Sequence, residues 1–185
     1  MIIIIAGVSR SGKTTIAKRL CKDSNFNYIP IDSLISTLEK LYPETGLKHL
    51  DDNIEFSPKL AEFLSEFISH IKYEDIDVIL DLYQLFPIDH QNILSDTKIP
   101  IIYLGYPGMT VKEKLLKIKQ HSRSKDWTNN TEDEEMIDII GFWKTESQIM
   151  KRQCSVLNIP FFDTGLDFED SIKNAENFLK EQFLC

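Results

Sequence analysis

Short, continuously apolar runs alternate along the chain with longer stretches in which apolar residues recur every three or four positions. Strands buried on both faces read as continuous apolar runs, whereas helices that cover a sheet show an apolar stripe with helical period. The pattern therefore predicts an α/β fold of three layers, with helices on both faces of a parallel sheet. Five strands are expected, at residues 2–6, 26–31, 76–81, 99–104 and 159–162.

Three helix starts can be predicted from capping patterns. Ser57 followed by Pro58 is typical of an N-cap and a first helical position, and an apolar stripe follows it to residue 71. Thr110 with Glu113, and Thr131 with Glu134, have capping-box spacing, so helices are expected from the residue after each threonine. The last of these continues almost to the fifth strand.

A final helix is expected over residues 168–183, and two segments look irregular, 42–58 and 122–131. In a compact domain, long irregular segments are more often functional lids than plain connectors.

The turn after the first strand carries the strongest chemical signal. Residues 7–14, "GVSRSGKT", match the phosphate-loop pattern Gly-x-x-x-x-Gly-Lys-Ser/Thr in its strand-to-helix setting. The glycines let backbone N–H groups face inward, Lys13 reaches the outer phosphates, and the Thr14 hydroxyl coordinates magnesium. ATP with Mg²⁺ is the predicted ligand, bound by Gly7, Val8, Ser9, Arg10, Ser11, Gly12, Lys13, Thr14 and a supporting Thr15. An ordinary glycine turn is the alternative; a dinucleotide fold is disfavoured because Gly-x-Gly-x-x-Gly is absent.

Composition and charge limit the kinds of partner that the protein is expected to bind. A chain of 185 residues with a net charge of −8 fits one domain, residues 1–185, and disfavours nucleic-acid or anionic-membrane surfaces. Three widely spaced cysteines, Cys21, Cys154 and Cys185, read as reduced thiols of a cytoplasmic protein. No apolar run approaches the length of a membrane span. The oligomeric state is left open.

A phosphate loop so near the start of a chain of this size resembles the P-loop small-molecule kinases, which include nucleoside monophosphate, shikimate and gluconate kinases. The resemblance implies a five-stranded parallel sheet in the order 2-3-1-4-5, a lid, and phosphoryl transfer from ATP to a small acceptor. Gly7, Gly12, Lys13 and Thr14 match its motif directly. It further implies that residues 33–72 form the acceptor-binding region and that residues 111–157 form helices flanking the lid loop.

Two aspartates follow apolar strands, at the edge where parallel sheets present ligands. Asp32 is expected to contact the acceptor hydroxyl or magnesium and to accept the hydroxyl proton; the alternative is a cap for a helix starting near Ser33. The family often has a second acid two positions later, where this chain has Leu34. Asp81 ends "DVILD" and is expected to hold magnesium through water; a plain strand-end turn is the alternative.

The segment of residues 80–87, "LDLYQLFP", partly matches the "LDGFPR" element of nucleoside monophosphate kinases. Leu82 replaces the glycine and the arginine that grips a monophosphate is missing, which disfavours a nucleotide acceptor. Tyr83 and Gln84 are expected to line the acceptor pocket; core packing is the alternative.

The lid position falls on "SRSKDWTNNT", residues 122–131. Arg123 is the predicted catalytic cation, because a guanidinium suits charge developing on a transferred phosphoryl group. Lys119 and Lys125 add positive charge, and a solvated basic loop is the alternative. Arg152 is read either as a second lid residue or as a surface charge.

The predicted function is therefore an ATP- and Mg²⁺-dependent kinase with a small-molecule acceptor. The alternative is a nucleotide-binding regulatory protein; a GTPase form of it is disfavoured because Asn-Lys-x-Asp is absent. Scattered histidines, without neighbouring ligands, indicate no metal site and are taken as bystanders: His49, His70, His90 and His121.

Overall fold

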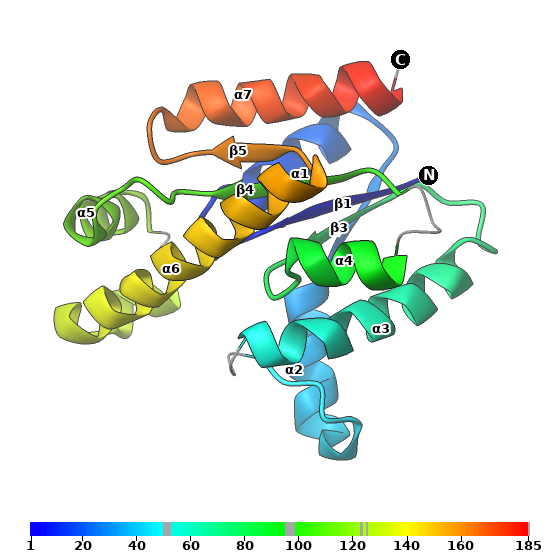
Figure 1. The fold of residues 1–185 in the computed structure, drawn as a ribbon, viewed down its shortest axis with the longest axis horizontal. Helices are drawn as coiled ribbons and strands as arrows, with labels where there is room; N and C mark the ends of the chain where they lie inside the picture. The colour runs from blue at the N-terminus through cyan, green and yellow to red at the C-terminus, as the bar shows by residue number, and fades with distance from the viewer. Residues whose placement is uncertain (50–52, 95–98, 123, 125, 185) are drawn as a thin grey trace.

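The computed structural model describes residues 1–49, 53–94, 99–122, 124 and 126–184. Its centre is a fully parallel sheet in the order β2-β3-β1-β4-β5, as the kinase resemblance implies (Figure 1). The strands are β1 Ile2–Gly7, β2 Asn27–Pro30, β3 Val78–Leu82, β4 Ile101–Gly105 and β5 Phe161–Asp163. Each lies within about two residues of its predicted position.

Helices connect successive strands and cover both faces of the sheet. The α-helices are α1 Lys13–Asp23, α2 Ile31–Leu41, α3 Asn53–Ile71, α4 Pro87–Leu94, α5 Val111–His121, α6 Asp133–Leu157 and α7 Phe168–Leu179. Short 3-10 helices, η1 Pro43–Thr45 and η3 Trp127–Asn130, interrupt the two segments predicted to be irregular, and a π-helical turn, η4 Lys180–Leu184, follows α7.

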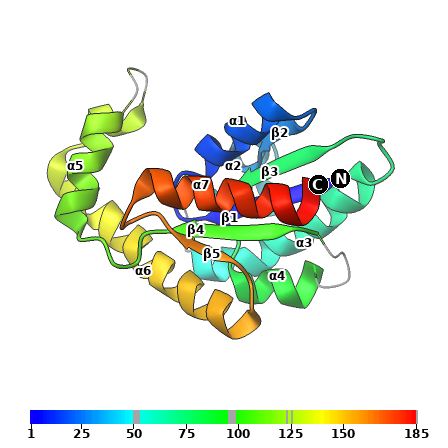
Figure 2. The ribbon, with the colours of Figure 1, turned by 90° about the horizontal axis from the view of Figure 1, so that it is seen from above.

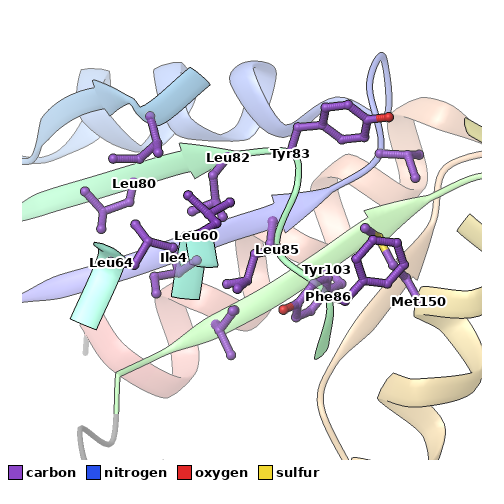
Figure 3. Packing of buried hydrophobic residues seen from close by; sticks show 14 of the residues in the cluster. Ile4, Leu60, Leu64, Leu80, Leu82, Tyr83, Leu85, Phe86, Tyr103 and Met150 are labelled. Carbon is purple, nitrogen blue, oxygen red and sulfur yellow. The ribbon is translucent and has the colours of Figure 1, made fainter. Parts of the chain in front are cut away.

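The isoleucines of β1 explain why this strand is central. Ile2 and Ile4 face one apolar core, whereas Ile3 and Ile5 face the other, so every position of the strand is buried. Helices α3, α4 and α6 cover the first face, and α1 and α7 cover the second (Figures 1 and 2). Figure 3 shows the first core, where Leu60 and Leu64 pack against Ile4 and neighbouring strands.

Helix α5 lies beyond the carboxyl ends of the strands, where it packs against α6 (Figures 1 and 2). It begins as predicted: the Thr110 side chain accepts the Glu113 N–H, and the Glu113 carboxylate accepts the Thr110 N–H. The structure therefore confirms this capping box.

Two other capping predictions are wrong. Helix α3 already includes Asn53, so Pro58 lies inside it, and the Ser57 hydroxyl accepts the N–H of Phe86 at 2.7 Å instead of capping. Thr131 donates its hydroxyl to the carbonyl of Trp127, and α6 starts after Glu132 without a side-chain cap. In both cases the side chain is engaged by a tertiary or preceding-turn partner that local spacing does not reveal.

Helix α4 was not predicted; its eight residues show little amphipathic pattern because Pro87 and Leu94 alone are buried. Cys21 and Cys154 are free thiols, and burial raises the pKa of Cys154 to about 12, as expected for an inert core residue. Cys185 lies outside the described residues. Among the helices that the structure describes, none has the length and apolar character required to cross a bilayer.

Candidate functional site

The loop between β1 and α1 is shaped by its two glycines. Gly7 has a φ of 134°, and a Cβ there would lie 2.0 Å from the carbonyl oxygen of Leu104 on β4. Gly12 has a φ of 103°, and a Cβ there would lie 2.5 Å from Cδ1 of Ile172 on α7. At Gly7 both the backbone conformation and the fixed Leu104 oxygen exclude a side chain, whereas at Gly12 it is the backbone conformation that requires glycine, because the Ile172 methyl group could move.

Two side chains of the loop donate to one of its own carbonyls. The Ser11 hydroxyl and the Lys13 ammonium both donate to the carbonyl of Val8, at 2.8 and 2.9 Å. The backbone N–H groups of residues 9–13 donate to no acceptor in the described part of the chain. Together with the first turn of α1, this row of N–H groups is the arrangement that binds phosphate.

Thr14 and Asp81, the two predicted metal ligands, lie together. The Thr14 hydroxyl donates to Oδ2 of Asp81 at 2.6 Å, and the Tyr28 hydroxyl donates to the same oxygen at 2.9 Å. Asp81 comes from the buried strand β3, next to β1, which brings its carboxylate under the loop. Burial, followed by the charge of Asp81, raises the pKa of Tyr28, so this phenol stays a donor.

A hydroxyl and a carboxylate are the oxygen donors that Mg²⁺ uses when it keeps most of its water and binds phosphate. The residues present therefore fit this ion. No group of three or more His, Cys, Asp or Glu side chains in the described residues forms a complete metal cage.

Asp32 lies in the first turn of α2, which follows Pro30 directly. Its carboxylate accepts the backbone N–H of Tyr83 at 3.1 Å, so the alternative role as a helix cap is not realised. Burial raises the pKa of Asp32, while the charge of Lys13 opposes this rise and that of Asp81 adds to it. A smaller lowering of the Asp32 pKa comes from its interaction with His49. The structure thus brings Asp32 into the electrostatic field of the phosphate loop.

Tyr83 and Gln84 lie at the carboxyl end of β3 and are buried with two polar partners. The Tyr83 hydroxyl donates to Glu146 at 2.6 Å and accepts from Asn53 at 2.7 Å. Asn53 also donates to Glu146 at 2.6 Å and accepts from Gln84 at 2.7 Å. Lys13 lies 5.8 Å from the centre of the Tyr83 ring. This polar cluster joins α3, β3 and α6 beside the loop.

Asn53 and Glu146 were missed by sequence reasoning. The sequence held a signal for Glu146, because this carboxylate interrupts the apolar stripe of α6. The structure shows that it is only 1% exposed. A carboxylate on the buried side of a helix is found almost only where polar partners satisfy it.

The lid role of Arg123 stays a prediction, because Arg123 and Lys125 lie outside the described residues. Asp126, which follows Lys125 in the sequence, forms an ion pair with Arg10 of the loop. The Arg10 guanidinium also lies 3.4 Å from the Thr128 hydroxyl. The Arg10 guanidinium lowers the pKa of Asp126 to about 2. The described later part of the predicted lid segment is therefore tied to the phosphate loop.

Two residues considered in the sequence analysis, Thr15 and Arg152, have no contact with the phosphate-binding N–H groups in the described part of the chain. Thr15 donates its backbone N–H to Gly12 at 3.0 Å and starts the hydrogen bonding of α1. Arg152 is exposed and lines a surface hollow with Ile88 of α4 near the end of α6, which agrees with the surface-charge alternative. A larger hollow, of about 380 Å³, lies at the amino ends of the strands, lined by Met1, Pro100 and neighbours, opposite the loop.

Sequence reasoning also missed two side chains that hold the loop from outside. The Tyr106 hydroxyl donates to the carbonyl of Ser9 at 2.9 Å, and the Lys114 ammonium donates to the carbonyl of Arg10 at 2.7 Å. Neither belongs to a local motif, since the loop precedes them by about a hundred residues.

No protein-family model matches the sequence, and no curated protein matches it. Among solved structures, shikimate kinase from Bacteroides thetaiotaomicron superposes with a TM-score of 0.60 and 16% identity, over 100% of this chain and 99% of that one. Deoxyadenosine kinase from M. mycoides, solved with bound dATP, gives 0.51 and 21% over 97% of this chain and 100% of the other. At these identities the likeness establishes the architecture: the chain has the fold of the P-loop small-molecule kinases.

Proposed function

We propose that this protein is an ATP- and Mg²⁺-dependent phosphotransferase that acts on a small-molecule acceptor. The observation that carries the proposal is the Thr14 hydroxyl at 2.6 Å from the Asp81 carboxylate, beneath a loop of free backbone N–H groups. The solved structures of similar fold named above are kinases of small molecules, which supports the same class of reaction.

On the nucleotide side, the N–H groups of residues 9–13 would bind the β- and γ-phosphates. The Lys13 ammonium now donates to the Val8 carbonyl, and a phosphate oxygen would be a stronger acceptor for it. Thr14 and Asp81 would hold Mg²⁺, directly and through water respectively. Bound there, Mg²⁺ would neutralise charge on the phosphates during transfer.

On the acceptor side, residues 33–72 would form the pocket, and Asp32 would accept the proton of the attacking hydroxyl. The raised pKa of Asp32 suits this role, because a carboxylate with higher proton affinity is a better general base at neutral pH. Tyr83 and Gln84 would form the floor of the pocket, held in place by Asn53 and Glu146.

The lid would close over the reacting groups from residues 122–131. Arg123 is proposed to neutralise the transferred phosphoryl group, and Arg10, already paired with Asp126, would fix the position of the lid's far end. Closure would exclude water and so prevent wasteful hydrolysis of ATP.

The test is release of ADP from Mg-ATP across a panel of nucleosides, nucleoside monophosphates, sugars, sugar acids and shikimate-like alcohols. Lys13→Ala serves as the blank, and Lys18→Ala, an exposed lysine of the same helix, as the matched control. One acceptor class should raise turnover strongly in wild type and in Lys18→Ala only, and Asp32→Asn should lower that turnover. Tight binding of ATP with no stimulating acceptor would instead favour a nucleotide-binding regulatory protein.

A further inference from the structure

Lys114 is a buried lysine outside the phosphate-loop motif. It lies on α5 and is 7% exposed, and its Nζ donates to the carbonyl of Arg10 at 2.7 Å. The same Nζ lies 3.8 Å from the centre of the Tyr106 ring. A buried lysine requires such partners, because removing an ammonium from water is costly.

Tyr106 and Lys114 hold two successive carbonyls of the loop. Tyr106 binds the Ser9 carbonyl at 2.9 Å, one residue before the carbonyl that Lys114 binds. Arg10 has a φ of 61°, a left-handed conformation that is unfavourable for a residue with a side chain. The contacts from β4 and α5 therefore stabilise the backbone conformation that directs the loop's N–H groups inward.

The charged side chains that act on Lys114 are themselves positive, which is unusual for a buried lysine. Burial first, and then the fields of Lys117 on its own helix, Arg10 in the loop and Lys13 at the start of α1, lower the pKa of Lys114 to about 7. No carboxylate of the described residues forms an ion pair with Lys114. Asp126, the carboxylate in the later part of the predicted lid segment, is paired with Arg10.

We propose that Lys114 positions the phosphate loop and takes up a proton from solvent when a nucleoside polyphosphate binds there. The inference rests on the proposed nucleotide binding. A bound polyphosphate would place several negative charges among Arg10, Lys13 and Lys114, so the protonated form of Lys114 would become favourable. Protonation would in turn strengthen its contacts to the Arg10 carbonyl and the Tyr106 ring, so binding and proton uptake stabilise each other.

The uptake can be estimated for pH 8. With a pKa of about 7, Lys114 holds its proton about one tenth of the time in the free protein. Binding that favours the protonated form can therefore take up at most about 0.9 proton per nucleotide at this pH. The affinity for nucleotide should then fall as the pH rises from 7 to 9.

Isothermal titration calorimetry with Mg-ADP at pH 8, in two buffers of different ionisation enthalpy, measures this uptake. Wild type should take up a measurable fraction of a proton, at most about 0.9, per Mg-ADP bound. Lys114→Arg, always charged, and Lys114→Gln, never charged, should both bind Mg-ADP without that uptake. Lys112→Arg, an exposed lysine of the same helix, should behave as wild type.

The outcomes separate the two proposals. No binding of Mg-ADP to folded wild type would contradict the nucleotide-binding proposal itself. Binding without proton uptake, or uptake that persists in the Lys114 variants, would overturn the role of Lys114 alone. Thermal unfolding of each variant shows whether it is folded, and either of the two Lys114 substitutions suffices for the comparison.

Discussion

Replacement of Gly7 by alanine should destabilise the protein more than any ordinary surface change. The left-handed backbone, with a φ of 134°, adds about 1–3 kcal/mol for a residue with a Cβ. The added Cβ would also lie 2.0 Å from a backbone oxygen of Leu104, which cannot rotate away, so β1 and β4 must separate. Overpacking of this kind costs about 1–3 kcal/mol. We therefore expect the free energy of unfolding to fall by about 2–6 kcal/mol.

The matched control is Gly141→Ala on α6. A Cβ there would meet no atom within 4 Å, so alanine should stabilise the helix by about 0.5–1 kcal/mol through its higher helix propensity. Equilibrium unfolding in urea, followed by circular dichroism, measures both variants against wild type. A Gly7→Ala protein within 1 kcal/mol of wild type would refute the reasoning, because it would mean that the loop tolerates a side chain where the structure leaves no space.

Three further changes have defined outcomes. Thr14→Val removes the donor to Asp81 and should weaken Mg-ATP binding at least about tenfold by calorimetry, whereas Thr14→Ser should not. Tyr83→Phe removes the donor to Oε2 of Glu146, while Asn53 still donates to Oε1, and should lower the urea-unfolding free energy by about 1–3 kcal/mol; no loss would contradict the hydrogen bonding described. The pKa of Asp126 is lowered to about 2, so its stabilising effect should be lost as the pH falls from about 4 to 2; the acid limb of thermal unfolding should be flatter in Asp126→Asn.

The sheet and its order were predictable because both depend on strong, repeated signals. Strand positions follow from apolar runs such as Ile2 to Ile5, which must be buried on both faces. The strand order follows from the resemblance to the P-loop small-molecule kinases, which rests on the phosphate-loop motif. The glycine positions were predictable for the same reason, since the motif encodes the backbone conformation that the structure shows at Gly7 and Gly12.

Contacts between distant segments were not predictable. Ser57 looks like a helix cap in sequence, but its hydroxyl is taken by the N–H of Phe86, 29 residues away. Lys114 reads as one lysine among several on a basic helix, and only the packing of α5 against the loop brings it to the Arg10 carbonyl. Arg123, the predicted lid cation, lies outside the described residues and stays a prediction.

The central place of β1 also has a consequence for biosynthesis. Its neighbours in the sheet are β3 and β4, and Ile4 pairs with Ile101, so the ribosome delivers the second neighbour roughly 100 residues after the strand itself. At translation rates of about 5–20 residues per second, β1 waits roughly 5–20 s for that partner. During this time a segment of four consecutive isoleucines lacks one of its two strand neighbours, and an unpaired apolar strand edge of this kind promotes aggregation of the nascent chain. Slower synthesis should therefore lower the yield of folded protein, and chaperones that bind apolar nascent segments should restore it.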